Sequence, residues 1–473
     1  MSEDRMFMRR IAVIGSGYVG LTTGACLASL GHRVVCADVE KTKVARLSAG
    51  EVSIREPRLA ELVAQGLAAG RLRFVIGASA AVPDAEVVFL CVPTPMGAGG
   101  AADLTAVESV VAEVRELLPA GCVVVNKSTV PVGTAARTAQ LLARPDVAVV
   151  SNPEFLREGS AVEDFLKPDR IVVGCEAQDA AERVAALYSR LGAPTVLTDA
   201  ASAEMVKYAA NCFLAMKLSY VNAVAELCER LGADVLDVTE GIGYDRRIGQ
   251  AFLQPGPGWG GSCLPKDTHA FLQVSAAAKF DFELLRASLD TNSRQQARMM
   301  DKVRDAVGGS LAGQRIGLLG LTFKAGTDDL RDSPALAVAA LLAAEGADLI
   351  GYDPSVRAAV PGMTDDLQIT DDPIKVASGA AALVVLTEWP EFRVLDWGLL
   401  AELVERRVVV DTRNLLDADV LRRVGFEVRG VGRRATPAVE PSAAIQAESS
   451  AVLSYDQSSQ LPHARSTACR WRG

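Results

Sequence analysis

The stretch IAVIGSGYVG, at residues 11–20, decides the fold of this 473-residue chain. Four apolar residues typical of a buried strand run directly into the pattern G-x-G-x-x-G, formed by Gly15, Gly17 and Gly20. A helix is expected from there to Leu30, followed by a second strand over residues 33–38. A strand, a glycine turn, a helix and a strand in this order form the βαβ unit that binds dinucleotides.

The three glycines and the end of the second strand have different expected roles. The first glycine turns the chain, the second admits a pyrophosphate, and the third lets the helix pack closely on the strand. Asp38 is placed to accept hydrogen bonds from the adenosine ribose, and its carboxylate would repel a 2′-phosphate. This favours NAD over NADP, although Lys41 and Lys43 weaken the preference. The alternative is a tight glycine turn without a ligand.

Apolar runs of strand length recur along most of the chain and alternate with segments of helix length. They occupy residues 73–77, 86–92, 122–128, 147–153, 315–323, 347–354, 382–389 and 407–414. Nearly continuous apolar strands indicate parallel sheets covered on both faces. We therefore predict an α/β fold with two Rossmann-like doubly wound domains joined by a long central helix.

That central helix is expected from an N-cap at Ser202 to Arg230, because apolar residues recur there at three and four. It would connect two domains and form a dimer core, or else lie buried within one domain. The expected division is residues 1–200 for NAD, 201–300 for a helical connector and dimerisation domain, and 301–435 for a second Rossmann-like domain. Residues 436–473, rich in Ala, Ser, Pro and Gln, are expected to be a disordered tail.

Composition narrows the class of protein. With 49 Lys and Arg against 58 Asp and Glu, a net charge of −9 and no long basic run, a nucleic-acid partner is not expected. No apolar stretch reaches membrane-spanning length, so no membrane partner is expected. Nine cysteines without a CxxC pair favour a reducing cytoplasm. Only three histidines occur, so no metal site is expected and proton transfer falls to other side chains.

The glycine-rich block GWGGSCLPKD, at residues 258–267, places one thiol, Cys263, beside a cation and a carboxylate. Such surroundings make a thiolate reactive, whereas a buried structural cysteine is the alternative. Lys207 and Asn211 are four residues apart and share one face of the long helix. A desolvated Lys207 could have its pKa lowered and take part in proton transfer, whereas a Lys that extends to solvent is the alternative.

Four polar residues follow predicted strands and are expected at the carboxyl edge of the sheet, where ligands collect in open parallel sheets. They are Thr94, Thr129, Glu154 and Glu158. For each threonine, a hydroxyl that serves only a turn or a helix cap is the alternative.

The chain resembles the UDP-glucose/GDP-mannose dehydrogenase family in a series of ordered blocks that cover nearly everything except the tail. The blocks are GSGYVG at Gly15, VPTP at Val92, STVPVGT at Ser128, NPEFLREG at Asn152, the helix with Lys207 and Asn211, GIGYDRRIG at Gly241, PGPGWGGSCLPKD at Pro255, GLTFKAGTDDLR at Gly320 and DTRN at Asp411. The resemblance implies NAD-dependent, four-electron oxidation of UDP-glucose at C6 to UDP-glucuronate. Cys263 would add to the aldehyde to give a thiohemiacetal, then a thioester that water hydrolyses.

The resemblance also implies that residues 201–300 carry the nucleophile loop and that residues 301–435 bind the UDP-sugar. It further implies the site residues. Catalytic roles fall to Cys263, Lys207, Asn211, Asp267, Thr129 and Glu154. The cofactor contacts are Gly15, Gly17, Tyr18, Val19, Gly20, Asp38, Lys43, Thr94, Thr129, Glu158, Lys266 and Arg331. The substrate contacts are Glu154, Phe155, Leu156, Lys207, Asn211, Arg247, Leu253, Gln254, Pro255, Gly256, Pro257, Gly260, Phe323, Lys324 and Arg413, with Arg247 reaching the site of a neighbouring subunit in a homodimer.

The choice of sugar stays open between two substrates. Leu264 also resembles GDP-mannose enzymes, while NPEFLREG and PGPGWGG favour UDP-glucose. The block GGSCLPKD argues against UDP-N-acetylmannosamine dehydrogenases, and Thr412 replaces a frequent glycine beside Arg413. A catalytically silent sensor of NAD and nucleotide sugar is a rival, as is a two-electron hydroxyacid dehydrogenase, which would not need Cys263.

Overall fold

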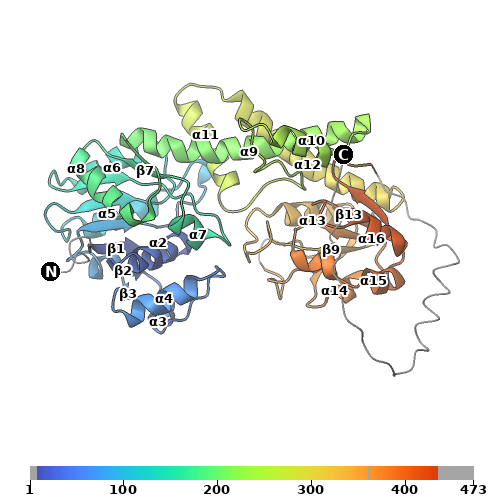
Figure 1. Cartoon of the computed structure of the whole chain (residues 1–473), viewed down its shortest axis with the longest axis horizontal. Helices are drawn as coiled ribbons and strands as arrows, with labels where there is room; N and C mark the ends of the chain where they lie inside the picture. The colour runs from blue at the N-terminus through green and yellow to red at the C-terminus, as the bar shows by residue number, and fades with distance from the viewer. Residues whose placement is uncertain (1–7, 361–362, 435–473) are drawn as a thin grey trace, which may run out of the picture.

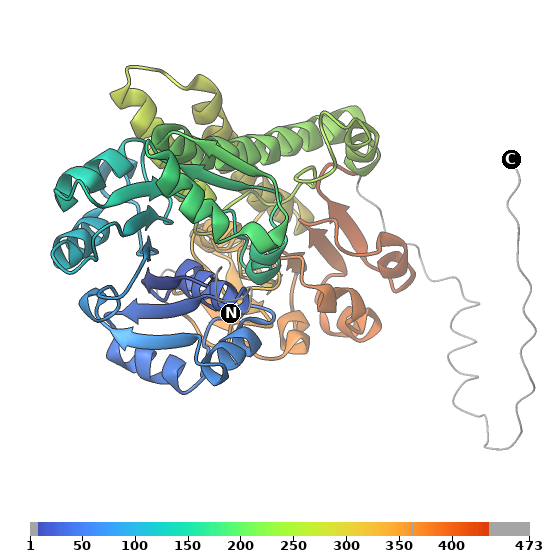
Figure 2. The ribbon, with the colours of Figure 1, turned by 60° about the vertical axis from the view of Figure 1, so that its left-hand side comes forward.

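The computed structural model describes residues 8–360 and 363–434, so the expected tail at 436–473, with Cys469, lies outside the described residues. Two sheets, each covered by helices, are joined along one side by a layer of long helices (Figure 1). The view turned by 60° shows the N-terminal sheet in front of the C-terminal half (Figure 2). The predicted α/β architecture with a long central helix is confirmed.

The N-terminal sheet has eight strands in the order β3-β2-β1-β4-β5-β6-β7-β8. The strands are β1 (Arg10–Ile14), β2 (Arg33–Asp38), β3 (Leu72–Ile76), β4 (Val87–Leu90), β5 (Val123–Asn126), β6 (Ala148–Ser151), β7 (Ile171–Gly174) and β8 (Thr195–Thr198). The helices are α2 (Tyr18–Ser29), α3 (Lys41–Ser48), α4 (Leu59–Ala68), α5 (Thr105–Val114), α6 (Thr134–Leu142), α7 (Ala161–Leu166) and α8 (Gln178–Ala186).

The first six strands are parallel, as the apolar runs predict. Strand β7 runs antiparallel to β6 through the single pair Ser151–Gly174, and neither β7 nor β8 was predicted. An antiparallel neighbour needs no long crossover. The expectation of an entirely parallel sheet is therefore wrong at this edge.

Strand β1 shows why its residues are apolar without alternation. Ile11 and Val13 belong to the core on one face of the sheet, and Ala12 and Ile14 belong to the core on the other. Because successive side chains point to opposite faces, a strand covered on both sides must be apolar throughout.

The C-terminal sheet has six parallel strands in the order β11-β10-β9-β12-β13-β14. They are β9 (Arg315–Leu319), β10 (Asp348–Tyr352), β11 (Leu367–Ile369), β12 (Ala382–Val385), β13 (Val408–Asp411) and β14 (Glu427–Gly430). Its helices are α13 (Pro334–Ala344), α14 (Pro373–Ala377), α15 (Trp397–Leu403) and α16 (Ala418–Arg423).

The helical layer consists of α9 (Ala200–Leu231), α10 (Val235–Gly243), α11 (Leu264–Ala277) and α12 (Glu283–Ala306). Helix α9 packs on β6 and β7 at one end and reaches the C-terminal half at the other, so it connects the two sheets (Figure 1). The predicted N-cap at Ser202 is wrong. Asp199 is the cap, and its carboxylate accepts a hydrogen bond of 2.7 Å from the Ser202 amide.

Every helix among residues 8–360 and 363–434 is too short or too polar to span a membrane. No group of three or more His, Cys, Asp or Glu side chains among these residues is arranged to hold a metal ion.

Candidate active site

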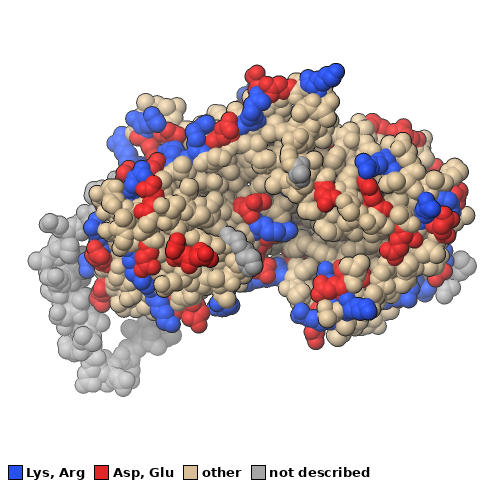
Figure 3. Space-filling view, turned by 180° about the vertical axis from the view of Figure 1, so that it is seen from behind, with Lys and Arg blue, Asp and Glu red and all other residues tan. Residues whose placement is uncertain are grey.

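Two cavities of about 700 and 760 Å³ lie between the N-terminal sheet, the helical layer and the C-terminal sheet. Seen from behind, the surface is hollowed between the two halves, and both acidic and basic side chains lie at the hollow (Figure 3). The cavities share four lining residues, which are Leu156, Glu158, Ser262 and Cys263. A molecule bound in one cavity could therefore contact a molecule bound in the other, next to Cys263.

The glycine turn forms one end of the first cavity. Gly15 has a φ of +97°, and a Cβ there would meet the carbonyl oxygen of Cys91 at 2.6 Å. A Cβ on Gly20 would lie 1.8 Å from the carbonyl oxygen of Gly15, so α2 can pack on β1 only with glycine. A Cβ on Gly17 would meet no described heavy atom within 4 Å, because this backbone faces the cavity. The cradle therefore leaves room for a pyrophosphate where the sequence predicts one.

Asp38 lies at the end of β2 and lines the first cavity. Its Oδ2 accepts hydrogen bonds of 2.9 Å from the Ser16 amide and from Lys43 Nζ. Burial alone would raise the pKa of Asp38, but the Lys43 and backbone hydrogen bonds outweigh it and lower the pKa. An ionised carboxylate here suits two ribose hydroxyls and disfavours a 2′-phosphate.

Most of the predicted cofactor residues line the first cavity. They are Gly15, Gly17, Tyr18, Val19, Asp38, Lys43, Thr94, Thr129, Glu158, Lys266 and Arg331. Gly20 does not line this cavity and instead allows α2 to pack closely on the turn at Gly15. The Thr94 hydroxyl donates a hydrogen bond of 2.9 Å to the Thr129 carbonyl, so it also holds the neighbouring turn.

Glu158 joins the two halves of the molecule beside the first cavity. Its Oε2 accepts a hydrogen bond of 3.2 Å from the Thr327 hydroxyl, and its Oε1 lies 3.2 Å from Arg331 Nη2. Ser262 also donates to Oε1, at 3.1 Å. Burial and the nearby charge of Asp329 raise the pKa of Glu158. This carboxylate therefore ties the N-terminal half to the nucleophile loop and to the C-terminal half.

The second cavity holds most of the predicted substrate residues. They are Phe155, Leu156, Lys207, Asn211, Gln254, Gly256, Gly260, Phe323, Lys324 and Arg413. Glu154 lines the first cavity instead, and Leu253, Pro255 and Pro257 are buried behind the loop. The structure does not bring Arg247 to the site of its own chain, because its side chain is 88% exposed and pairs with Asp245 at 2.6 Å.

The loop between α10 and α11 is held by four polar side chains that sequence reasoning missed. Asn222 and Gln295 bond to the Gly256 amide and carbonyl at 2.9 and 2.7 Å. Asn292 bonds to both the amide and the carbonyl of Trp259, and Ser219 accepts a bond of 2.9 Å from the indole. Buried amides from α9 and α12 thus replace secondary structure for this backbone. In sequence, such residues look like the solvent face of a helix.

Arg170, which lines the second cavity, was also missed. Its guanidinium lies 3.5 Å from the centroid of the Phe155 ring, and it makes no ion pair within the described residues. Lys324 in the same cavity also makes none within that part of the chain, and burial lowers its pKa. Two cations without a carboxylate partner suit an anionic ligand. The contact between Arg170 and the Phe155 ring could not be expected from sequence spacing.

Cys263 is the first residue before α11 and lies in the wall between the two cavities. Burial and the carboxylates of Glu154 and Asp267 raise the pKa of its thiol, although Lys207 acts in the opposite direction. The thiol is therefore protonated at neutral pH. The carboxylate of the block, Asp267, acts on the thiol as the sequence suggests, but the cation that acts on it is Lys207 and not the neighbouring Lys266.

Lys207 is buried and does not extend to solvent, which excludes the alternative considered from sequence. Its Nζ lies 3.0 Å from Glu154 Oε1. Burial alone lowers its pKa, but the charges of Glu154, Cys263 and Asp267 outweigh burial and raise the pKa. The expectation of a lowered pKa is wrong, because sequence could not show the carboxylate 53 residues away. Lys207 is thus a buried ammonium and hydrogen-bond donor.

Asp267 links the remaining predicted catalytic groups. Its Oδ2 accepts a hydrogen bond of 2.6 Å from Asn211 Nδ2, and its Oδ1 lies 2.6 Å from Lys266 Nζ. It is buried one turn beyond Cys263, and its own amide bonds to the Cys263 carbonyl. Asn211 is therefore oriented by Asp267, with its amide group at the second cavity.

The C-terminal sheet has a different turn after its first strand. Asp353 comes directly after β10, in a place like that of Asp38 at the end of β2, but its Oδ2 accepts bonds from the amides of Leu321 and Thr322 and from the Trp389 indole. Asp353 is fully buried. Its carboxylate is therefore used inside the fold, so this sheet does not repeat the dinucleotide cradle.

Comparison with known proteins finds three consecutive domain models of one family in this chain. The UDP-glucose/GDP-mannose dehydrogenase family matches with its NAD binding domain at residues 9–192, its central domain at 201–294 and its UDP binding domain at 317–418. These models account for most of the described residues.

Individual relatives agree over nearly their whole length. The UDP-glucose 6-dehydrogenase of Rhizobium meliloti (strain 1021) is 44% identical over 90% of this chain and 99% of the relative. TuaD, a UDP-glucose 6-dehydrogenase of Bacillus subtilis (strain 168), is 40% identical over 92% and 95%. The structure of a UDP-glucose dehydrogenase from Pyrobaculum islandicum superimposes with a TM-score of 0.82 at 37% identity, covering 90% and 98% of the two chains. The chain belongs to the UDP-glucose/GDP-mannose dehydrogenase family.

Proposed function

We propose that this protein oxidises C6 of UDP-glucose to the carboxylate of UDP-glucuronate with NAD. The observation that carries the proposal is the place of Cys263, in the wall shared by a dinucleotide cradle and a cation-lined cavity. Two named UDP-glucose 6-dehydrogenases at 40% and 44% identity support the choice of sugar nucleotide. A sensor would not need the thiol, Lys207, Asn211 and Asp267 together.

The cradle at Gly17 and the carboxylate of Asp38 fit NAD, with Lys43, Thr94 and Arg331 as further contacts. Bound NAD supplies the hydride acceptor for each of two successive oxidations. We assign the first cavity to NAD and the second to the sugar nucleotide, whose diphosphate Lys324 and Arg413 would bind. The proposed division into residues 1–200, 201–300 and 301–435 follows these roles.

The chain's own groups would move the protons and hold the substrate. In the first oxidation carbon C6 would give up a hydride, and the proton of the C6 hydroxyl would pass to a water held by Thr129 and Glu154. The Cys263 sulfur then bonds to the aldehyde carbon, and the thiol proton goes to the carbonyl oxygen. A second hydride and proton leave to give a thioester, whose carbon–sulfur bond breaks when water adds.

Lys207 and Asn211 would stabilise the negative oxygen that forms in these steps. Because the pKa of Lys207 is raised, its role is that of a positive donor and not of a general base. Asp267 would fix Asn211 through the bond of 2.6 Å and would not contact the substrate itself.

The test is a substrate panel with purified protein. UDP-glucose, GDP-mannose and UDP-N-acetylmannosamine are each offered with NAD, and NADH is followed by absorbance. Turnover with UDP-glucose at the highest kcat/KM is expected. Turnover with GDP-mannose alone would replace the proposed substrate, and saturable NAD binding without turnover of any of the three would leave a sensor.

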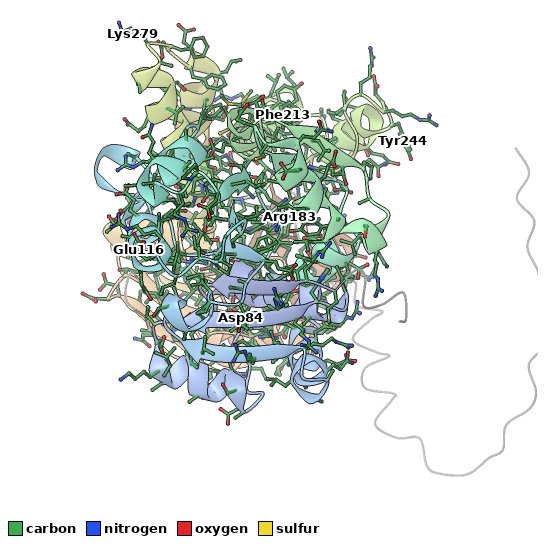
Figure 4. All side chains as sticks on the ribbon, turned by 90° about the vertical axis from the view of Figure 1, so that its left-hand side faces the viewer. Asp84, Glu116, Arg183, Phe213, Tyr244 and Lys279 are labelled. Carbon is green, nitrogen blue, oxygen red and sulfur yellow. The ribbon has the colours of Figure 1, made fainter. Side chains whose placement is uncertain are left out.

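We further propose that the protein acts as a homodimer through its helical layer. Large apolar side chains are exposed there, among them Phe213, Tyr220, Leu231 and Tyr244. Phe213 and Tyr244 lie on this layer at the upper edge of the molecule in Figure 4. Arg247 lies outside its own site, as a residue serving a second copy would. Light scattering that gives the mass of one chain at micromolar concentration would contradict this proposal.

We also propose a cytoplasmic location. All eight cysteines of the described residues are free thiols, which suits a reducing compartment. Fractionation of cells into cytoplasmic and envelope proteins tests this, and recovery of the protein in the envelope would contradict it.

A further inference from the structure

Lys127 is a buried ammonium that the chemistry above does not use. It follows β5, is only 5% exposed, and lines neither cavity. Its Nζ donates hydrogen bonds to Asn152 Oδ1 at 3.1 Å and to the Tyr188 hydroxyl at 3.4 Å. No carboxylate of the described residues lies within ion-pair distance of it. A buried charge without a direct partner is costly unless other charges balance it.

Asn152 connects Lys127 to the reaction centre. Its Oδ1 also accepts a bond of 2.6 Å from Tyr188, its Nδ2 donates one of 2.7 Å to the Val172 carbonyl, and its amide donates to Asn126. Each polar group of this side chain is therefore used. Asn152 precedes Pro153 and Glu154, so a clamped Asn152 fixes the start of the segment that carries the Glu154 carboxylate.

The ionisable groups that face Lys127 come from four elements. They are Cys91 after β4, Glu154 after β6, Tyr188 after α8 and Lys207 on α9. Burial lowers the pKa of Lys127 to about 8, while the charge of Glu154 acts in the opposite direction and that of Lys207 in the same direction as burial. Burial also keeps Cys91 and Tyr188 protonated by raising their pKa values. Glu154 is thus the negative charge that Lys127 faces.

The charged groups around Cys263 are paired except for Lys127. Lys207 pairs with Glu154, Lys266 pairs with Asp267, and Arg331 pairs with Glu158 and Asp329, whereas Lys127 has no carboxylate of its own among the described residues. A thiolate at Cys263, or an oxyanion beside it, adds a negative charge that the charge of Lys127 partly offsets. Without Lys127, Glu154 would be balanced by Lys207 alone, and less of the Lys207 charge would be available to the sulfur.

We propose that Lys127 is a positioning residue that holds Glu154 in place and shares its negative charge, so that Lys207 can stabilise negative charge at Cys263. The proposal rests on the assignment of Cys263 as the nucleophile, but not on the identity of the sugar. It gives a role to a side chain that touches neither NAD nor substrate.

The experiment measures the alkylation rate of Cys263 by iodoacetamide from pH 6.5 to 9.5, followed by peptide mass spectrometry, so no substrate is needed. Lys127→Met keeps the length and apolar stem of the side chain but removes its charge. Below pH 8, where Lys127 carries its charge, we expect alkylation to slow about tenfold, which corresponds to a rise of roughly one unit in the thiol pKa. Above pH 8 the difference should shrink, because Lys127 itself loses its proton there. An unchanged rate would overturn the proposal, whichever sugar the protein oxidises.

Two further variants separate charge from structure. Tyr188→Phe removes one bond to Asn152 but keeps the ammonium, so its alkylation profile should match that of the unchanged protein; a tenfold slowing in Tyr188→Phe would show that packing alone is responsible. In a Glu154→Gln background, Lys127→Met should lose most of its effect, because there is no carboxylate to share. A full tenfold effect in that background would contradict action through Glu154.

Because an apolar residue replaces an unpaired buried charge, Lys127→Met is expected to unfold at no lower temperature than the unchanged protein. A lower midpoint together with an unchanged alkylation profile would assign Lys127 a purely structural role. If Lys127→Met does not fold, Lys127→Gln, which keeps a donor to Asn152 without the charge, should show the same slowing, and its absence would overturn the proposal.

Discussion

Replacing Lys207 by Met should destabilise the protein far more than breaking another ion pair on the same helix. Lys207 and Glu154 are 3.0 Å apart, and their side chains are 4% and 6% exposed. Removing one partner of a buried pair leaves an uncompensated charge, which costs roughly 3–5 kcal/mol. The matched control is Arg230→Met, which breaks a pair with Glu226 near the other end of α9, where Arg230 is 72% exposed. An exposed pair of this kind contributes only about 0.3–0.5 kcal/mol.

The pH dependence of the Lys207→Met effect follows from the two partners. Because the pKa of Lys207 is raised in the folded protein, its stabilising contribution is complete below the ordinary value of 10.5 and is lost only as pH rises through the raised value. Between pH 6 and 9 it is therefore constant. In the variant the Glu154 carboxylate stays buried without its partner, so the loss of stability should be the same at pH 6 and at pH 9.

The assay is urea unfolding of both variants, followed by circular dichroism at pH 6, 7 and 9. The free energy of unfolding of the first transition should fall by several kcal/mol for Lys207→Met at each pH and by less than about 1 kcal/mol for Arg230→Met. Turnover of Lys207→Met should also drop by about 10²–10³, the usual cost of losing a donor to a negative oxygen. Equal losses of stability in the two variants, or a loss for Lys207→Met that changes strongly between pH 6 and 9, would refute the reasoning.

Two other substitutions test the cavities separately. Asp38→Ser removes a charged hydrogen-bond acceptor from the first cavity, which is worth roughly 1.5–3 kcal/mol. The KM for NAD should therefore rise about ten- to 150-fold, while NADP becomes a better cofactor, and steady-state kinetics with both cofactors would measure this. An unchanged ratio of kcat/KM for NAD to kcat/KM for NADP would show that Asp38 does not contact the ribose. Gly260→Ala would place a Cβ 1.9 Å from the Asp332 carbonyl oxygen, so the loop and the C-terminal half should be forced apart. The thermal midpoint should fall, and the KM for UDP-glucose should rise by a larger factor than the KM for NAD. Gly241→Ala, where a Cβ meets no described atom within 4 Å, is its control and should behave like the unchanged protein.

The parts of the fold that follow from local patterns could be predicted from the sequence. Strands buried on both faces are apolar throughout, so β1 and β4 to β6 stand out, and the glycine turn at residues 15–20 marks the first βα junction. Strand β8 was missed because its four residues, Thr195–Thr198, lie at an exposed edge and show no apolar run. The cap at Asp199 was missed because both Asp199 and Ser202 are good cap residues, and only the backbone decides between them.

The candidate site likewise has a part that could be predicted from the sequence and a part that could not. Its residue types and blocks could be found from sequence, because Cys263, Lys207 and Asn211 stand in distinctive local settings. The electrostatics could not, since the partner of Lys207 comes from a segment 53 residues away and reverses the direction of its pKa shift. The anchors Asn222, Asn292 and Gln295 were also hidden, because a polar residue on a helix ordinarily faces water.

The central claim is a four-electron oxidation through Cys263, and the ratio of NADH formed to UDP-glucose consumed tests it most directly. The measurement combines NADH absorbance with chromatography of the sugar nucleotides at complete conversion. Two NADH per UDP-glucose, with UDP-glucuronate as the product, is the predicted result, and Cys263→Ser should form no net acid. One NADH per UDP-glucose, or two with Cys263→Ser as well, would contradict the claim.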